Sequence, residues 1–292
     1  MHLRLELITA GSCTHPAWVV TGRPSLAILR FPSLVGVIRH PVRGLILFDA
    51  GYSPRFFSET RRFPEALYRH LTPVTCGEED TVAAQLRRAG KDPDDVALVI
   101  LSHFHADHVG GLLDFPRARL LYRRAALERD FRRRSAWRHL AAGVLPGLLP
   151  ADLEGRSLFV EDQPLVPLPG SYAPFTEGYD LLGDGNLLGV DLAGHARGQL
   201  GVLLPRTQGP EVFLIADACW QRRTVSHLEF PHPVVRLITA DMRRYRQRIR
   251  DLHQLALARP DLLLVPSHCA ESLAFAREQL GAAREQLGHG AA

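Results

Sequence analysis

The chain has 292 residues, of which 46% are hydrophobic and 23% are charged, a balance that allows a large buried core and excludes a disordered protein. The formal net charge of +4 is small for this length and argues against a protein that binds nucleic acid through a concentrated basic patch. No signal peptide and no apolar run long enough for a transmembrane helix is apparent, so we expect no membrane partner. Four cysteines without CxxC spacing predict free thiols in a reducing cytoplasm.

Short apolar runs that end in turn residues recur through the first hundred positions. They predict strands at 3–8, 25–31, 34–40, 44–48 and 96–101. One or two short helices, interrupted by Pro64, are expected within 53–74, and a helix is expected over 78–89, ending at Gly90. This part of the chain therefore alternates between strands and helices, as in an α/β protein.

The strand expected at 96–101 runs directly into Ser102-His103-Phe104-His105-Ala106-Asp107-His108. Ligand sites of α/β proteins lie at the carboxyl ends of strands, and imidazole and carboxylate groups suit zinc, iron or manganese. In an extended turn the alternate residues His103 and His105 can point to one side, whereas the adjacent Asp107 and His108 can point elsewhere. The cluster therefore predicts two metal ions that share one loop.

The rest of the chain continues the intermixed pattern without a compositional break, which predicts a single α/β domain over 1–292. Strands are expected at 119–122, 187–192, 198–204, 212–216 and 262–265, and helices at 125–140, 241–258 and 271–287. A seven-residue repeat stacks Leu273, Leu280 and Leu287 on one face of the last helix. We expect this helix to pack on the body of the protein; a contact within a homodimer is the alternative.

Three further polar residues follow apolar strands in the second half: His195, Asp217 and His268. Taken singly, such residues are commonly caps or turn residues. Beside the cluster at 103–108 they are the candidates for the remaining ligands that a metal pair requires. Asp49, at the end of the strand 44–48, either orients a metal-bound histidine or belongs to the turn before Gly51.

The HxHxDH pattern from His103 to His108, followed in order by His195, Asp217 and His268, resembles the metallo-β-lactamase superfamily over nearly the whole chain. This resemblance implies an α+β fold of the αββα type, with two mixed β-sheets flanked by helices. It also implies two divalent ions, with zinc expected and iron, manganese or cobalt accepted by the same ligands. The first ion is assigned to His103, His105 and His195, the second to Asp107, His108 and His268, and Asp217 bridges the two.

The implied chemistry is hydrolysis by a hydroxide that bridges the two ions, since metal ions lower the pKa of bound water from about 16 to about 7. Asp107 and Asp217 are the catalytic candidates, with Asp107 as the proton shuttle. Within the superfamily the chain is most similar to the N-acyl homoserine lactone lactonases, in length, in its single domain and in the aromatic-rich segment 53–75. A small-molecule substrate with an acyl or lactone carbonyl is therefore expected, such as an acyl homoserine lactone used in quorum sensing.

Substrate contacts are expected from residues of the segment 53–75, which in the lactonases overhangs the site, and from its neighbours: Tyr52, Phe56, Phe57, Tyr68 and Trp220. Packing of this segment into the ordinary core is the alternative. The lactonases carry a tyrosine three residues after the bridging aspartate, where this chain has Trp220, which donates an N–H but has no titratable hydroxyl. A different lactone, an ester or a thioester is therefore also open.

Two other functions fit parts of the sequence. A phosphodiesterase or nuclease would use the same metal ligands, with arginine runs at 132–134 and 243–250 as its support. A signalling protein of the same fold without catalysis is less consistent with seven filled ligand positions. Cys219 lies two residues after Asp217, and Cys269 directly follows His268. Both cysteines are interpreted as buried packing residues.

Overall fold

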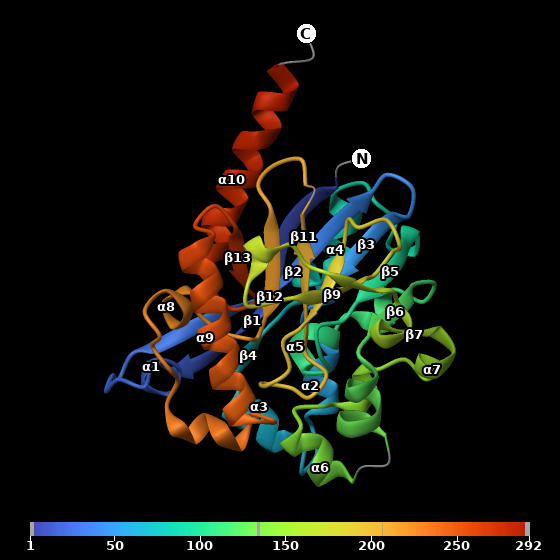
Figure 1. Cartoon of the computed structure of the whole chain (residues 1–292). Helices are drawn as coiled ribbons and strands as arrows, with labels where there is room; N and C mark the ends of the chain where they lie inside the picture. The colour runs from blue at the N-terminus through green and yellow to red at the C-terminus, as the bar shows by residue number, and fades with distance from the viewer. Residues whose placement is uncertain (1–2, 133–134, 206, 290–292) are drawn as a thin grey trace.

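Two β-sheets pack face to face, and helices cover the outer face of each sheet (Figure 1). The computed structural model describes residues 3–132, 135–205 and 207–289, with side chains up to residue 282. The four layers form the αββα sandwich that the sequence predicted.

The first sheet has seven strands in the order β4-β1-β2-β3-β5-β6-β7. Strands β3, β5, β6 and β7 are mutually parallel, whereas β1, β2 and β4 pair antiparallel with their neighbours. The carboxyl ends of β3 and β5 therefore meet at one edge, which brings Asp49 beside the loop that starts at Ser102. The strands are β1 (Arg4–Pro16), β2 (Ile28–His40), β3 (Gly44–Phe48), β4 (Val74–Thr75), β5 (Val96–Ile100), β6 (Arg119–Tyr122) and β7 (Ser157–Phe159).

The second sheet has six strands in the order β13-β12-β11-β10-β9-β8. Strand β12 runs parallel to β13. Strand β10 runs in the same direction as β12, because both β10 and β12 are antiparallel to β11. The chain segments that leave β10, β12 and β13 carry His195, Asp217 and His268 to one edge of this sheet. The strands are β8 (Leu165–Pro167), β9 (Glu177–Asp180), β10 (Leu188–Asp191), β11 (Leu200–Leu204), β12 (Val212–Ala216) and β13 (Leu263–Pro266).

Most of the described helices are short, and only two of them exceed three turns. The α-helices are α1 (Ala17–Thr21), α2 (Arg55–Glu59), α3 (Ala66–Leu71), α4 (Val82–Arg88), α5 (Ala106–Val109), α6 (Ala136–Ala141), α7 (Leu153–Arg156), α8 (Arg222–Ser226), α9 (Met242–Ala258) and α10 (Ala270–His289). The remaining helical segments are the 3-10 turns η1 (Glu78–Asp80), η2 (Pro93–Asp95), η3 (Leu112–Asp114), η5 (Pro146–Leu148), η6 (Val160–Asp162), η7 (Gly170–Tyr172) and η8 (Pro233–Leu237), and the π-helix η4 (Ala126–Phe131).

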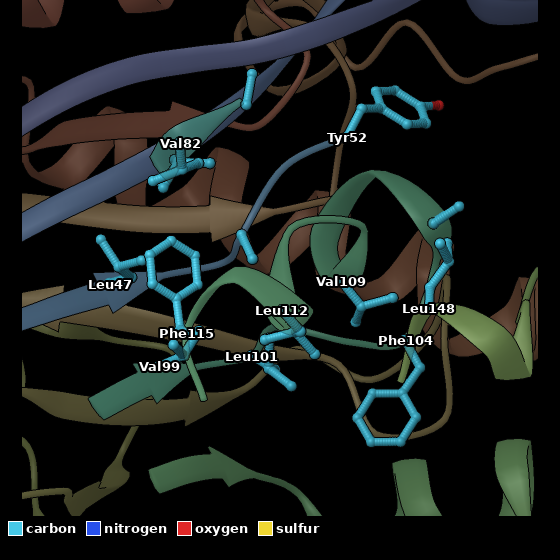
Figure 2. Close-up of a cluster of buried hydrophobic side chains, with 14 of the residues drawn as sticks. Leu47, Tyr52, Val82, Val99, Leu101, Phe104, Val109, Leu112, Phe115 and Leu148 are labelled. Atoms are coloured by element: carbon cyan, nitrogen blue, oxygen red, sulfur yellow. The ribbon is translucent and has the colours of Figure 1, made fainter. Parts of the chain in front are cut away.

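Three layers of buried side chains hold this arrangement. Alternate residues of the strands, such as Ile38, Phe48 and Leu214, fill the space between the two sheets. On the outer face of the first sheet, Leu47 and Val99 pack against Phe104, Leu112 and other residues around α5 (Figure 2). On the outer face of the second sheet, α9 buries one stripe of its surface through Tyr245, Ile249, Leu252 and Leu255.

Among the differences between the structure and the elements expected from the sequence, three bear most on the fold. The strands expected at 25–31 and 34–40 are one strand, β2, which continues through Pro32 because that residue pairs with Ser12 next to an irregularity in β1. The helix expected over 125–140 is wrong: η4 ends at Phe131, Arg132 is extended, and α6 begins at Ala136. Strands β4, β7, β8 and β9 were missed, because runs of two to four residues carry little periodicity.

The last helix starts against the body and then extends beyond the sheets (Figure 1). Leu273 and Leu280 are buried among the residues between the sheets, as expected, whereas the side chain of Leu287 lies outside the described part of the chain. All four cysteines are free and buried. Across the described residues, every helix is too short or too polar to cross a bilayer.

Candidate metal centre

The loop after β5 and the short helix α5 carry four of the seven predicted ligands. His105 is the residue before α5, and its backbone carbonyl accepts bonds from His108 and Val109, which leaves its ring free of any capping role. Gly110 and Gly111 let α5 lie against the loop after β3, since a Cβ on Gly111 would stand 2.4 Å from the carbonyl oxygen of Ala50. This close approach sets the position of Asp107 and His108.

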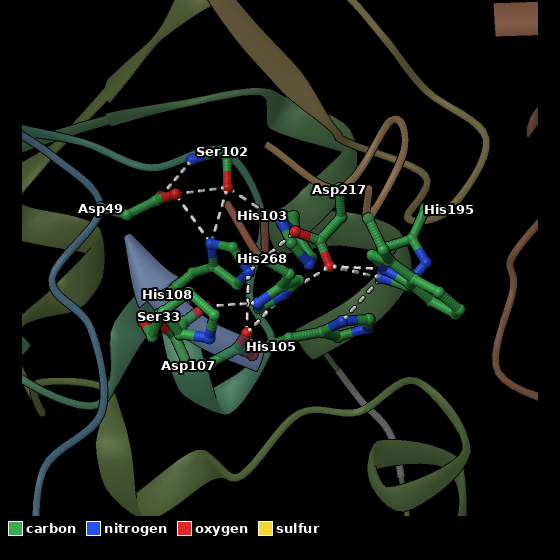
Figure 3. A network of polar contacts seen from close by, with 12 residues as sticks. Ser33, Asp49, Ser102, His103, His105, Asp107, His108, His195, Asp217 and His268 are labelled. Atoms are coloured by element: carbon green, nitrogen blue, oxygen red, sulfur yellow. Dashed lines mark hydrogen bonds and ion pairs between the residues drawn. The ribbon is translucent and has the colours of Figure 1, made fainter. Parts of the chain in front are cut away.

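All seven predicted residues come together, in two groups whose potential ligand atoms lie within 4.8 Å of one another. The first group is His103, His105 and His195, in which the Nε2 atom of His195 lies 3.0 Å from the Nδ1 atom of His105. The second group is Asp107, His108, Asp217 and His268. Figure 3 shows the rings and carboxylates of both groups converging on one point.

Asp217 touches both groups. Its Oδ2 atom lies 3.5 Å from His195 Nε2 in the first group and 3.1 Å from His268 Nε2 in the second. Its Oδ1 atom lies 3.4 Å from His108 Nε2. A carboxylate between two ligand sets has the geometry of a bridging ligand.

Among the described residues, no hydrogen bond satisfies the buried His103 Nε2 atom, and His108 Nε2 and Asp217 Oδ1 have only ion-pair contacts without hydrogen-bond geometry. Unpaired buried polar atoms cost free energy, and proteins rarely retain them without a ligand or water to satisfy them. Nitrogen and carboxylate donors that face one another in sets of three and four fit divalent ions such as zinc. The donor set present therefore fits two metal ions.

The two groups differ in electrostatics. Burial, with the neighbouring His105, lowers the pKa of His195 to about 3, and burial with His108 and His105 holds the pKa of His103 well below its usual range. Both rings are therefore neutral, which is the form that binds metals. In the second group burial by itself would lower the pKa of His268, but the carboxylates of Asp217 and Asp107 raise that pKa to about 10. Burial would raise the pKa of both carboxylates, but the nearby histidines lower it well below its usual range and keep them ionised.

Groups behind the ligands fix their orientation. Asp49 is fully buried and accepts the Nδ1–H of His108 at 2.7 Å, so it orients a predicted ligand rather than serving only as a turn residue. Ser102 donates its backbone N–H and its hydroxyl to Asp49, at 2.8 and 2.9 Å. His268 donates Nδ1–H to the carbonyl of Pro32 at 2.8 Å, which turns its Nε2 atom toward the site. Such outer contacts select the ring tautomer that metal binding needs.

Gly143 is a contact that sequence reasoning missed. Its backbone lies against the ring of His105, and a Cβ there would stand 2.5 Å from the Cδ2 atom of that ring. Neither periodicity nor local spacing links residues 38 positions apart, so the sequence carried no signal for this contact.

Substitution of Gly143 by alanine is expected to weaken zinc binding about 10- to 100-fold, because the added methyl displaces His105. Gly90→Ala is the matched control, since Gly90 has the same φ of +68° but nothing within 4 Å of its Cβ position. Both variants should lose about 1 kcal/mol of stability from the left-handed backbone. Competition with a chromophoric chelator measures zinc affinity; equal affinities in the two variants would show that contact with His105 has no effect.

A cavity of about 310 Å³ opens over the metal centre. Its floor includes His105, Asp107, His195, Asp217 and His268, and its walls are mainly apolar. Of the residues expected to contact substrate, three line this cavity: Tyr52, Tyr68 and Trp220. Wall residues that the sequence did not single out include Cys13, His15, Val20, Phe31, Leu140, Leu237 and Ile238.

The aromatic segment 53–75 contributes to both the cavity wall and the core. Tyr68 and Leu71 of α3 face the cavity, whereas Phe56 of α2 is fully buried behind it. The ring of Phe56 packs edge-to-face on Tyr52, Phe57 and Tyr68, with centroids 5.5 to 5.7 Å apart. Phe56 and Phe57 are not among the described wall residues: Phe56 supports the two tyrosines, and Phe57 packs on Phe56.

Comparison with known proteins gives the family. The family model of the metallo-beta-lactamase superfamily matches residues 28–209. The chain belongs to the metallo-beta-lactamase superfamily. It is a metal-dependent hydrolase of that superfamily, as the HxHxDH pattern predicted.

Several curated proteins are similar to this chain in sequence. N-acyl homoserine lactonase AttM of Azorhizobium caulinodans is 30% identical over 217 residues, which cover 74% of this chain and 75% of AttM. N-acyl homoserine lactonase AiiB of Agrobacterium fabrum is 30% identical over 176 residues, covering 60% of this chain and 59% of AiiB. A probable metallo-hydrolase of Mycobacterium tuberculosis is 28% identical over 253 residues, covering 80% and 74%. The match to AiiB therefore spans less than two thirds of that relative's length.

Solved structures of other proteins have a similar fold. An N-acyl homoserine lactone hydrolase with the product N-hexanoyl-L-homoserine at its catalytic metal centre has a TM-score of 0.70 at 19% identity, covering 93% of this chain and 95% of that one. AidC, a dizinc quorum-quenching lactonase, has a TM-score of 0.60 at 16% identity, covering 92% and 88%. At these identities the likeness establishes the fold.

Proposed function

We propose that this superfamily member opens a lactone or cleaves an ester or thioester. The observation that carries the proposal is that five residues of the seven-residue centre form the floor of a mainly apolar cavity. An apolar cavity favours the aliphatic part of an acyl compound, while the polar floor meets its carbonyl group. The lactonase names of AttM and AiiB support an acyl homoserine lactone as one substrate.

The seven residues would hold two metal ions, for which zinc is the expected identity. His103, His105 and His195 would hold the first, Asp107, His108 and His268 the second, and Asp217 both. Bound ions supply an acidified water as nucleophile and a Lewis acid for the carbonyl oxygen. Asp107, whose Oδ2 atom faces His108 and His268 at 3.2 and 3.1 Å, is the group that accepts a proton and returns it to the leaving oxygen.

Trp220 is assigned a positioning role beside the substrate. Its indole N–H donates to Asp217 Oδ2 at 3.1 Å, and its ring lies edge-to-face on His195 with centroids 5.6 Å apart. Its apolar face lines the cavity. The side chain therefore holds the bridging carboxylate while it contacts the acyl compound.

Trp220→Phe is expected to lower kcat about tenfold, with a smaller change in KM, because it removes one hydrogen bond to Asp217 and keeps the aromatic face. Trp137→Phe, at an exposed tryptophan that contacts Phe63 and is not among the cavity wall residues, is the control. Steady-state kinetics on the best substrate measures both. A kcat of Trp220→Phe equal to that of the unmodified protein would show that Trp220 has no positioning role.

Hydrolysis of a small panel by the metal-quantified protein tests the proposed function. The panel holds acyl homoserine lactones, a δ-lactone, an aryl ester, a thioester and bis(p-nitrophenyl) phosphate. We expect turnover of a carbonyl compound, and a rate that rises with acyl length if the apolar walls contact the chain. Turnover of the phosphodiester alone would contradict the proposal and favour the nuclease alternative.

The arginine runs give that alternative little support. Arg132 pairs with Glu154, Arg244 with Asp191 and Arg248 with Asp251. Arg133 and Arg134 lie outside the described residues. These three arginines have carboxylate partners within the protein, and a nucleic-acid contact is not needed to explain them.

A further inference from the structure

A second, more polar space adjoins the metal centre. This charged annex, of about 200 Å³, is lined by Asp130, Arg138 and Arg197, together with Ile238, Thr239 and several alanines. His105 and His195 line both the annex and the apolar cavity. A molecule that reacts over these two histidines can therefore extend a group into the annex.

The annex has an excess of positive charge among the described residues that line it. Arg197 Nη1 pairs with Asp130 Oδ1 at 2.8 Å, and Asp130 is buried. Arg138 is exposed and forms no ion pair with any other described residue. The guanidinium group of Arg138 therefore has no carboxylate partner among the described residues. The guanidinium group of Arg197 uses one of its five N–H donors on Asp130.

The backbone fixes Arg197 relative to the metal centre. Arg197 follows His195 by two residues in the turn between β10 and β11. The next residue, Gly198, lies so close to η4 that a Cβ would stand 2.6 Å from the backbone nitrogen of Ala126. Since η4 also carries Asp130, the same contact sets both partners of the ion pair beside His195.

We propose that the charged annex binds a carboxylate of the reacting molecule. The inference rests on the proposed function, because hydrolysis of an ester or lactone creates such a group. Water adds its hydroxyl to the acyl carbon, the bond from that carbon to the leaving oxygen breaks, and a proton moves to the leaving oxygen. The acid that results ionises to a carboxylate, which planar guanidinium groups bind well. A carboxylate already present on the substrate has the same chemistry.

Calorimetric titration of the metal-loaded protein with hexanoate and with hexanamide tests the annex without any turnover. Arg138→Gln should weaken hexanoate binding about fivefold and leave hexanamide binding unchanged. Arg87→Gln, at an exposed arginine of α4 that does not line the annex, is the matched control and should change neither. Arg197→Gln should act in the same direction, with its melting temperature measured because it also breaks the pair with Asp130.

A second arm identifies the source of the carboxylate. It compares kcat/KM for the p-nitrophenyl monoester of succinic acid with that for p-nitrophenyl butyrate. A lower ratio in Arg138→Gln assigns the annex to a substituent of the substrate, whereas weaker hexanoate binding with an unchanged ratio assigns it to the acid product. Unchanged hexanoate binding and an unchanged ratio in both arginine variants would overturn the inference. Hexanoate binding that depends on Arg138 in a protein that hydrolyses no carbonyl compound would support the annex and reject only the proposed function.

Discussion

Asp217→Asn is expected to lower kcat/KM for the best substrate by about three orders of magnitude or more. Asp217 touches both ligand groups, through Oδ2 to His195 and His268 and through Oδ1 to His108. Asparagine keeps the shape but loses the negative charge and one acceptor, so it cannot bridge two cations. Metal-ion stabilisation of the transition state amounts to several kcal/mol, and each 1.36 kcal/mol is about tenfold in rate. His105→Ala, which removes a ligand of the first group, is expected to have a similar effect.

Asp251→Asn is the control for this prediction, because Asp251 is also a buried, ion-paired aspartate but lies on α9 with Gln247 and Arg248. It should lose stability and keep the kcat of the unmodified protein. Circular dichroism checks that Asp217→Asn and His105→Ala remain folded. Full hydrolysis by either of these two folded variants would reject the two-metal account.

Asp49→Asn is expected to weaken the second metal site about 10- to 100-fold. The carboxylate of Asp49 accepts three hydrogen bonds, one from His108 and two from Ser102, and an amide has only one oxygen to accept them. The loss leaves a buried donor unpaired and frees the ring of His108 to turn. The backbone is not strained by the change, because Asp49 has a φ of +64° and asparagine tolerates this conformation well.

Asp184→Asn provides a matched comparison, since Asp184 accepts a bond of 2.7 Å from the buried His40, and neither residue belongs to the two ligand groups or to the cavity wall. Titration with zinc against a chelator should show two tight sites in this variant and one weakened site in Asp49→Asn. Two sites of normal affinity in Asp49→Asn would mean that His108 needs no partner at Nδ1.

The sequence predicted the parts of the site that depend on strand ends. His195, Asp217 and His268 each follow an apolar strand, and strand direction alone brings such residues to one edge of a sheet. The run from His103 to His108 was visible because its residues are neighbours in the chain. The family and the sandwich fold followed from this pattern and are confirmed by the family match and the structure.

Contacts between distant backbone segments were beyond sequence reasoning. His268 is oriented by the backbone carbonyl of Pro32. Because every residue type has a backbone carbonyl, the sequence gives no indication of this contact. The annex depends on a break in the helix expected over 125–140, where Arg132 is extended and pairs with Glu154 although no glycine or proline interrupts the segment. Tertiary contacts overrode the local helical pattern there.

Titration of metal into chelator-treated protein, followed by lactone or ester hydrolysis, shows whether activity depends on two metal ions. Hydrolysis should be lost when metal is removed and should return in full only when about two zinc ions per chain are bound, because two donor groups share Asp217. Full hydrolysis without metal, or with one ion per chain, would contradict this expectation.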